Sequence, residues 1–166
     1  MSQTHHRILL SFFGFLLTVA VSAPAFAIER QQAMNWCWAS SIQEVMGQKG
    51  VYLSQPEIVA RLTGWPQDRP ASSQEVTWLL NSLGVGAWQA GRPGSPQELY
   101  QTLGAGYRII AFVRPSAGPV GHFVVFEGYD AMGNIVVADP ANGLTQLYPL
   151  QTVYWGWRWQ DGVVVP

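Results

Sequence analysis

The chain has 166 residues, of which 48% are hydrophobic and only 11% are charged, so it can bury a core and is not an intrinsically disordered protein. Nine Lys and Arg residues against ten Asp and Glu residues give a formal net charge of −1. This near-neutral charge argues against a protein that binds nucleic acid or an anionic membrane surface. The length fits a single domain.

The N-terminal segment has the pattern of a secretory signal peptide. A basic start at residues 5–7 precedes an uncharged apolar run over residues 8–21, and the small-x-small cleavage pattern Ala25-Phe26-Ala27 follows. The apolar run is shorter than the roughly 20 residues that a membrane-spanning helix needs. We therefore expect a signal peptide at residues 1–27 and a domain at residues 28–166, located in the periplasm or outside the cell, with no membrane span after the signal is removed.

The predicted domain contains one cysteine, Cys37, and one histidine, His122. An exported protein meets oxidants, yet a lone thiol cannot form a disulfide within its own chain. Three interpretations remain open for Cys37: a small buried hydrophobic residue, an intermolecular bridge that makes a dimer, or a nucleophile.

The residues around Cys37 predict that it lies at the start of a helix. Asn35 is a suitable N-cap, and apolar residues recur at helical spacing between positions 39 and 46. In the first turn, unpaired backbone N–H groups and the helix dipole favour the thiolate, which is the nucleophilic form.

The first half of the domain, to about Leu103, carries signals of short helices. Three capping boxes pair a Ser with a Glu three residues later, two prolines fit first-turn positions, and three glycines fit the helix ends. These positions are Ser54/Glu57, Ser72/Glu75 and Ser95/Glu98, then Pro56 and Pro96, then Gly64, Gly84 and Gly104.

From Tyr107 onward the pattern changes to runs of β-branched and aromatic residues, which predict an antiparallel sheet. The expected strands are residues 109–113, 123–126 and 135–137, and a strand that presents Trp155, Trp157 and Trp159 on one face. Helices followed by a sheet give an α+β fold.

Residues 122–139 read as a hairpin whose turn contains Gly and Asn and whose return strand ends before Pro140. This hairpin brings His122 and Asp139 to the same end of the ladder. Asp130 falls at the turn, roughly 26 Å along the strand from His122, and is interpreted as a turn residue.

These residues could form a thiol active site. A Cys nucleophile needs a base and a third group that orients the base, and His122 and Asp139 fit those roles. Gln31, or its neighbour Gln32, could donate a carboxamide N–H to an oxyanion. Each residue also has an ordinary alternative, as a strand-end histidine, a turn cap or a solvated glutamine.

The segments QQAMNWCWAS and GHFVVFEGYDAMGNIVVADP resemble the papain-like cysteine peptidases, in particular compact bacterial forms related to bacteriocin-leader-processing peptidases and pathogen-effector proteases. The resemblance implies a papain-like fold, with Cys37 as nucleophile, His122 as general base and acid, Asp139 as the residue that orients His122, and Gln31 as oxyanion donor. Trp38 stands where the bacteriocin-processing relatives usually have Gly.

The sequence thus predicts an exported thiol hydrolase that cleaves peptide or amide bonds in a peptide or protein substrate. The alternatives are an amidase acting on peptidoglycan stem peptides, an acyl transferase, and a catalytically silent module that binds a peptide through a Trp-rich surface. No cofactor is implied, and one Cys with one His cannot supply an ordinary structural zinc site. The oligomeric state is left open.

Overall fold

The computed structural model describes residues 27–116 and 120–166, so nearly all of the predicted signal peptide lies outside the described residues. The elements in chain order are α1 (Cys37–Gln48), α2 (Gln55–Thr63), α3 (Ser73–Ser82), β1 (Trp88–Gly91), α4 (Pro96–Gly104), β2 (Arg108–Val113), β3 (His122–Tyr129), β4 (Ile135–Asp139), β5 (Leu144–Tyr148), the π-helix η1 (Thr152–Gly156) and β6 (Asp161–Val165). The predicted α+β fold is confirmed. In the described ranges no helix is long and apolar enough to cross a bilayer.

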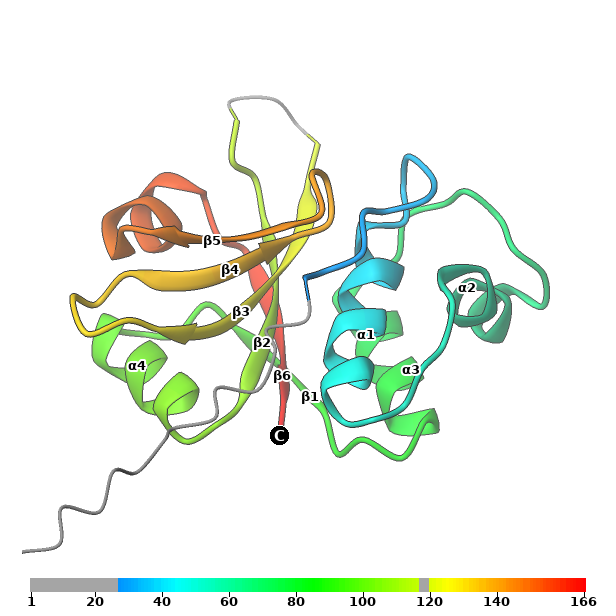
Figure 1. The fold of residues 1–166 in the computed structure, drawn as a ribbon, viewed down its shortest axis with the longest axis horizontal. Coiled ribbons are helices and arrows are strands. Elements are labelled where there is room, and N and C mark those ends of the chain that lie inside the picture. Colours follow the sequence, from blue (N-terminus) through cyan, green and yellow to red (C-terminus); the bar gives the residue numbers. More distant parts are fainter. Residues whose placement is uncertain (1–26, 117–119) are drawn as a thin grey trace, which may run out of the picture.

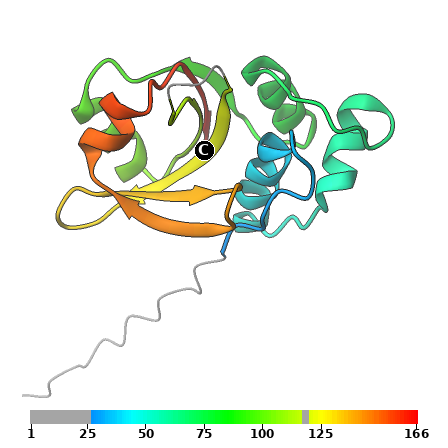
Figure 2. The same cartoon turned by 90° about the horizontal axis from the view of Figure 1, so that it is seen from above.

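The six strands form one antiparallel sheet in the order β1-β6-β2-β3-β4-β5. Helices α1, α2 and α3 lie together on one side of the sheet, and α4 and η1 lie on the other (Figures 1 and 2). The contacts of α1 with β3 and of α4 with β3 join these layers at the centre of the sheet. We call the side with α1–α3 the helical half and the sheet with α4 and η1 the sheet half.

The period of two in the strands explains why the sheet has a core on each face. Phe123 and Val125 of β3 pack in the core that contains α1–α3. Val124 and Phe126, which alternate with them, pack in the second core beneath α4 and η1. All four side chains are at most 3% exposed, so β3, which together with β2 forms the middle of the sheet, is buried on both faces.

Two of the three expected capping boxes are complete. Ser54 and Ser72 each accept the backbone N–H of the Glu three residues later, and that Glu accepts from the Ser backbone in return. Ser95 accepts from Glu98 N–H, but the Glu98 carboxylate accepts from Gly94 N–H instead. Two-sided caps therefore start α2 and α3.

The predicted helix ends are correct at Gly64 and Gly84, which have positive φ angles of 83° and 82°. The prediction was wrong at Gly104, which is the last residue of α4, and Gly106 adopts the left-handed conformation, with φ of 90°. A Cβ on Gly104 would lie 3.0 Å from the Tyr129 hydroxyl. Gly104 is thus small because Tyr129 packs against it, and not because the chain turns there.

The predicted strand carrying three alternating tryptophans was also wrong. Thr152–Gly156 is π-helical, and the last strand begins only at Asp161. The three rings point to different surroundings: Trp155 is 53% exposed, Trp157 packs on Tyr148 and Trp159 packs edge-on against Phe126. A helical turn followed by a positive φ at residue 158 breaks the period of two that a strand would need.

Candidate active site

Cys37 is the first residue of α1, as predicted, and its side chain is partly exposed. The expected Asn35 cap is wrong, because the N-cap is Trp36 and no side chain caps this helix. Instead, a loop some thirty residues away holds the helix start. Asp68 Oδ1 accepts from Asn35 N–H at 2.8 Å.

Two tryptophans on either side of the thiol bind the same loop. Trp36 Nε1 donates to Gln67 O at 2.7 Å, and Trp38 Nε1 donates to Arg69 O at 3.0 Å. Trp38 is completely buried and also lines the cavity in front of Cys37. The indole rings thus hold the backbone on both sides of the thiol in one position.

His122 and Asp139 meet at one end of the β3–β4 hairpin, as predicted. His122 begins β3, Asp139 ends β4, and His122 Nε2 lies 2.6 Å from Asp139 Oδ1. Asp139 Oδ1 also accepts from Ala141 N–H at 2.9 Å. The side chains of His122 and Asp139 are 18% and 20% exposed, so water screens this pair only in part.

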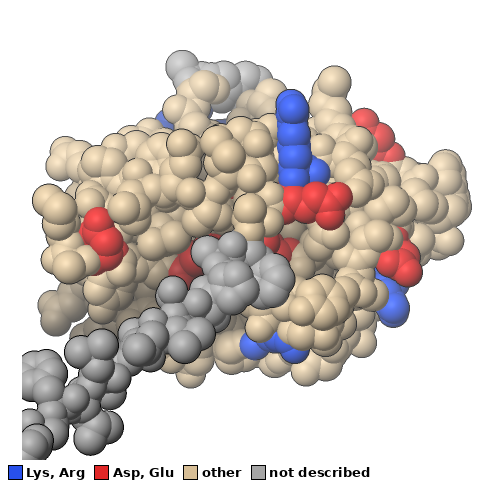
Figure 3. Space-filling view, in the orientation of Figure 1, with Lys and Arg blue, Asp and Glu red and all other residues tan. Residues whose placement is uncertain are grey.

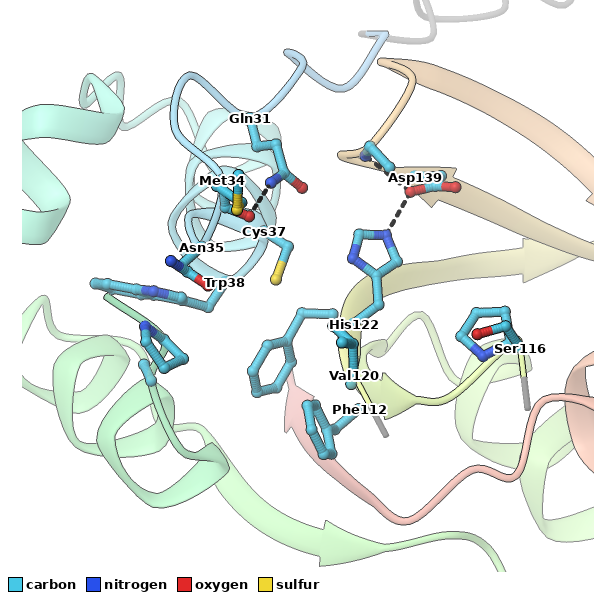
Figure 4. Close-up of a pocket in the computed structure, with 16 residues that line it drawn as sticks. Gln31, Met34, Asn35, Cys37, Trp38, Phe112, Ser116, Val120, His122 and Asp139 are labelled. Atoms are coloured by element: carbon cyan, nitrogen blue, oxygen red, sulfur yellow. Dashed lines mark hydrogen bonds and ion pairs between the residues drawn. The ribbon is translucent and has the colours of Figure 1, made fainter. Parts of the chain in front are cut away.

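The imidazole of His122 lies between the Asp139 carboxylate and the Cys37 thiol (Figure 4). Burial by itself would lower the pKa of His122, but hydrogen bonds with Asp139 and Cys37, and their charges, raise it to about 9. Burial opposes ionisation of Asp139 as well, yet the hydrogen bonds from His122 and from Ala141 N–H bring its pKa below the ordinary value. This arrangement favours an imidazolium beside the thiol and an ionised carboxylate behind it.

A cavity of about 600 Å³ opens in front of these three side chains, between α1 and the start of β3. Its walls are largely apolar and include Trp38, Pro70, Phe112, Pro115, Val120 and Phe123. Among the described residues that line it, His122 and Asp139 are the only ionisable ones besides Cys37. Phe112 packs against Phe123, with ring centroids 4.9 Å apart. Elsewhere, charged side chains of both signs are scattered over the face shown in Figure 3.

Of the two glutamines considered for the oxyanion, Gln31 lines the cavity. Its Nε2 donates to Ala33 O at 2.9 Å and to Met34 O at 2.6 Å. Gln32 is exposed, and its Nε2 donates to Glu29 Oε1 at 2.6 Å. Gln31 is therefore the candidate in reach of the thiol, and its catalytic role stays a prediction.

Asp130 lies away from the cavity, in the turn of the hairpin. Its carboxylate accepts from the backbone N–H groups of Met132 and Asn134 and from the Asn134 side chain. These contacts are those of a turn residue, as interpreted from the sequence.

Sequence reasoning did not single out the cavity residues Phe112 and Pro70, or the loop that binds Trp36 and Trp38. Phe112 reads as an ordinary strand residue, and nothing near residues 67–70 signals a contact with α1. Their roles arise from contacts between distant segments. In the described ranges no group of three His, Cys, Asp or Glu side chains could hold a metal ion.

Comparisons with known proteins give one family model and several solved structures. The sequence profile described as "Peptidase_C39 like family" matches residues 24–161. No curated protein matches the sequence. Among solved structures, a putative C39-like peptidase from Bacillus anthracis is similar with a TM-score of 0.66 and 13% identity, over 85% of this chain and 94% of that chain.

Two further structures are similar over most of their length. The peptidase domain of Streptococcus ComA, a bi-functional ABC transporter involved in a quorum-sensing pathway, has a TM-score of 0.68 and 13% identity, over 85% of this chain and 98% of that one. A double glycine motif protease from an AMS/PCAT transporter, in complex with the leader peptide, has a TM-score of 0.63 and 19% identity, over 84% and 90%. At these identities the similarity establishes a shared fold.

Proposed function

This chain belongs to the Peptidase C39 like family and is a cysteine peptidase, and from this premise we propose that Cys37, His122 and Asp139 carry out its chemistry on a peptide substrate after export. The observation that carries the proposal is the hydrogen bond of 2.6 Å between His122 and Asp139, on the side of the imidazole away from Cys37. This hydrogen bond supports the proposal because a Cys nucleophile needs a base and a third group that orients the base, and the His122 ring lies between Cys37 and Asp139.

In the acylation step, the Cys37 thiolate attacks the carbonyl carbon of the scissile amide and forms a tetrahedral intermediate with a negative oxygen. The Cys37 backbone N–H, at the start of α1, and a Gln31 carboxamide N–H stabilise that oxygen. The intermediate collapses as the C–N bond breaks, and the His122 imidazolium gives its proton to the leaving amine. The product is a thioester on Cys37.

In the deacylation step, neutral His122 takes a proton from a water molecule that attacks the thioester. The C–S bond breaks, the carboxylic acid product leaves, and the thiolate and imidazolium are restored. Asp139 keeps Nε2 of the ring occupied throughout, so that Nδ1 faces the reacting atoms. Its charge also favours the imidazolium that acylation needs.

The cavity indicates the kind of peptide that would bind. Its lining is largely apolar, and the described residues in it carry no ionisable side chain besides the three proposed catalytic ones. A peptide segment with uncharged side chains beside the scissile bond therefore fits with the least cost of desolvating charge. The neighbour solved with a leader peptide supports a peptide as the substrate class.

The test is a digest of an unbiased peptide library with the mature protein and with Cys37→Ala, read by mass spectrometry. Cleavage by the wild type alone supports the proposal. Thiol labelling by a peptidase-directed probe without cleavage indicates the silent binding module, and hydrolysis of peptidoglycan stem peptides alone indicates the amidase. If the purified protein migrates as a dimer on nonreducing gels only, Cys37 forms an intermolecular disulfide and is not a free nucleophile.

Export is the second part of the proposal. Ile28, the residue that follows the expected cleavage site, is 2% exposed and packs in the core of the helical half. Cleavage after Ala27 would therefore leave every described core residue in the mature chain. N-terminal sequencing of material collected outside the cytoplasm should begin at or near Ile28, and a first residue of Met1 or Ser2 contradicts export with cleavage.

A further inference from the structure

Gln55, the first residue of α2, has a side chain that is completely buried. Its Oε1 accepts from Gln32 N–H at 2.8 Å, and its Nε2 donates to Arg30 O at 3.0 Å and to Gln43 Oε1 at 3.1 Å. A carboxamide without such partners would be costly to bury. The Gln55 carboxamide is thus fully hydrogen-bonded, and it is not needed to form α2, because none of its partners belongs to α2.

The backbone partners of Gln55 are the residues immediately before and after Gln31. The backbone N–H of Gln31 donates in the opposite direction, to Pro140 O at 2.9 Å. Three successive residues, 30–32, are therefore held from α2 on one side and from the residue that follows Asp139 on the other. The direction in which the Gln31 side chain leaves the backbone is set by these bonds.

The same segment is also bound to α1, the helix that begins with Cys37. Glu29 accepts from Gln43 Nε2 at 2.8 Å and from Gln32 Nε2 at 2.6 Å. The hydroxyl of buried Ser40 donates to the Glu29 carbonyl. Because Gln43 and Ser40 belong to α1, the segment and the thiol keep a constant relative position.

The Gln31 side chain depends on a fixed backbone because it has few rigid contacts of its own. Among the described residues, its Nε2 donates to Ala33 O and Met34 O in its own loop. It must turn from one of them to donate to an oxyanion in the cavity. An error of about 1 Å in such a donor can cost 10²-fold in rate. The backbone from which the side chain turns must therefore be fixed.

We propose that Gln55 is a positioning residue, which fixes the backbone on both sides of Gln31 so that the Gln31 carboxamide can reach the oxyanion formed at Cys37. The inference rests on the proposed function, in which Gln31 serves that oxyanion. Gln55 itself is not among the described residues that line the cavity, so it acts on the oxyanion through Gln31 and not by direct contact.

The experiment compares wild type, Gln55→Met, Gln31→Ala and the double variant on the best fluorogenic peptide from the library digest. Activity is normalised to thiols that react with iodoacetamide, which forms no oxyanion. Gln55→Met should lower kcat by about tenfold with little change in KM, and weaken binding of the matching peptide aldehyde by about the same factor. The iodoacetamide rate should stay at the wild-type value, and in the Gln31→Ala background Gln55→Met should add less than about twofold.

Gln48→Met is the control for the same substitution, since Gln48 also donates from its side-chain amide, to Glu44 and Glu127, but is exposed and lies away from the cavity. It should keep the wild-type kcat. The isosteric variant Gln55→Glu takes the place of Gln55→Met in the experiment if Gln55→Met does not fold. Its protonated carboxyl can still donate one hydrogen bond, so its kcat relative to wild type should rise toward acidic pH.

An unchanged kcat in both Gln55 variants, or full additivity of Gln55→Met with Gln31→Ala, overturns the positioning role while leaving the peptidase intact. Equal losses in kcat and in the iodoacetamide rate indicate a merely structural role and overturn it too. If the wild type cleaves no peptide, the proposed function fails, and the role of Gln55 fails with it.

Discussion

Cys37 and His122 face each other from two halves of the molecule that hold them in different ways. In the sheet half, the His122 ring is held by a residue 17 positions away in the same hairpin. In the helical half, the start of α1 has no side-chain cap and depends on Asp68, Gln67 and Arg69, more than 30 positions away. His122 is thus positioned by a local pairing, and Cys37 by contacts between distant segments.

This difference shows where the site is sensitive. The register of a hairpin is set by its turn and by the alternation of its side chains. His122 and Asp139 therefore meet when the hairpin forms. The thiol and the residue 30–32 segment reach their places only after α1, α2 and the loop at residues 67–69 have packed together. Substitutions in the two halves should therefore impair the protein in different ways.

Asp139→Ala removes the side chain that holds the His122 ring in the sheet half. Without the carboxylate, His122 can rotate or take the wrong tautomer, and we expect turnover to fall by about 10- to 10⁴-fold. The pKa of His122, raised to about 9 in the native protein partly by Asp139, should fall. The alkaline limb of kcat, where the imidazolium loses the proton for the leaving amine, should then move to lower pH.

The control for Asp139→Ala is Asp130→Ala, in the turn of the same hairpin. Loss of its turn hydrogen bonds should cost about 1 kcal/mol of stability while the folded fraction turns over normally. Circular dichroism establishes that both variants are folded before rates are measured. Normal turnover in Asp139→Ala with lost turnover in Asp130→Ala would mean that the third catalytic residue is misassigned.

Gln31→Ala removes the proposed oxyanion donor of the helical half and leaves the Cys37 thiol in place. Because an oxyanion donor acts on the transition state, turnover should fall by roughly 10²-fold while alkylation of Cys37 stays nearly unchanged. Gln32→Ala is the control and should keep near-normal turnover. If Gln32→Ala shows the large loss instead, the oxyanion donor is Gln32.

His122→Ala tests whether the two halves form one ion pair. With His122 present, the thiol should react with iodoacetamide rapidly at pH 6, and the substitution should slow this by about tenfold or more. The rates should converge above about pH 9, where the imidazolium is lost and free thiols ionise in any case. Equal rates at pH 6 would exclude the ion pair.

Glu127→Gln tests the packing between the halves, where α1 meets β3. Glu127 is the residue left unpaired by the irregular register of β3 between Phe126 and Gly128. Gln48 Nε2 donates to Glu127 at 2.7 Å and to Glu44 at 2.9 Å, and Arg108 Nε donates to Gln48 Oε1. Burial, followed by the Glu44 carboxylate, raises the pKa of Glu127 to about 7.

Because the folded state binds this proton more tightly than the unfolded chain, the stabilisation is present below pH 4.5 and is lost as pH rises through about 7. A neutral amide at position 127 should therefore raise Tm at pH 8 by about 3 °C and flatten the dependence of Tm on pH between 5 and 8. Thermal melts across that range measure both effects. A lower Tm at pH 8 would show that Arg108 outweighs Glu44.

Much of the fold could be read from local patterns because their causes are local. The caps at Ser54 and Ser72 and the turn at Asp130 involve residues within four positions of each other. The hairpin brought His122 and Asp139 together for the same reason. The short strands β1 and β6 were not predicted, because they acquire their partners only when distant segments pair. Strand β5 was not predicted either, although it pairs with its chain neighbour β4.

Residue order therefore predicted the α+β class, the family resemblance, the placement of Cys37 in a first turn and the meeting of His122 with Asp139. The packing of distant segments sets how the Cys37 helix is held at its start, where the tryptophans of residues 155–159 point, which glycine ends α4, and that Gln31 rather than Gln32 lies at the cavity. The first set depends on periodicity and short-range hydrogen bonds, which residue order encodes directly. The second depends on which distant surfaces pack together. Tyr129 contacts Gly104, and Gln55 binds the residues on either side of Gln31, only once those surfaces have packed.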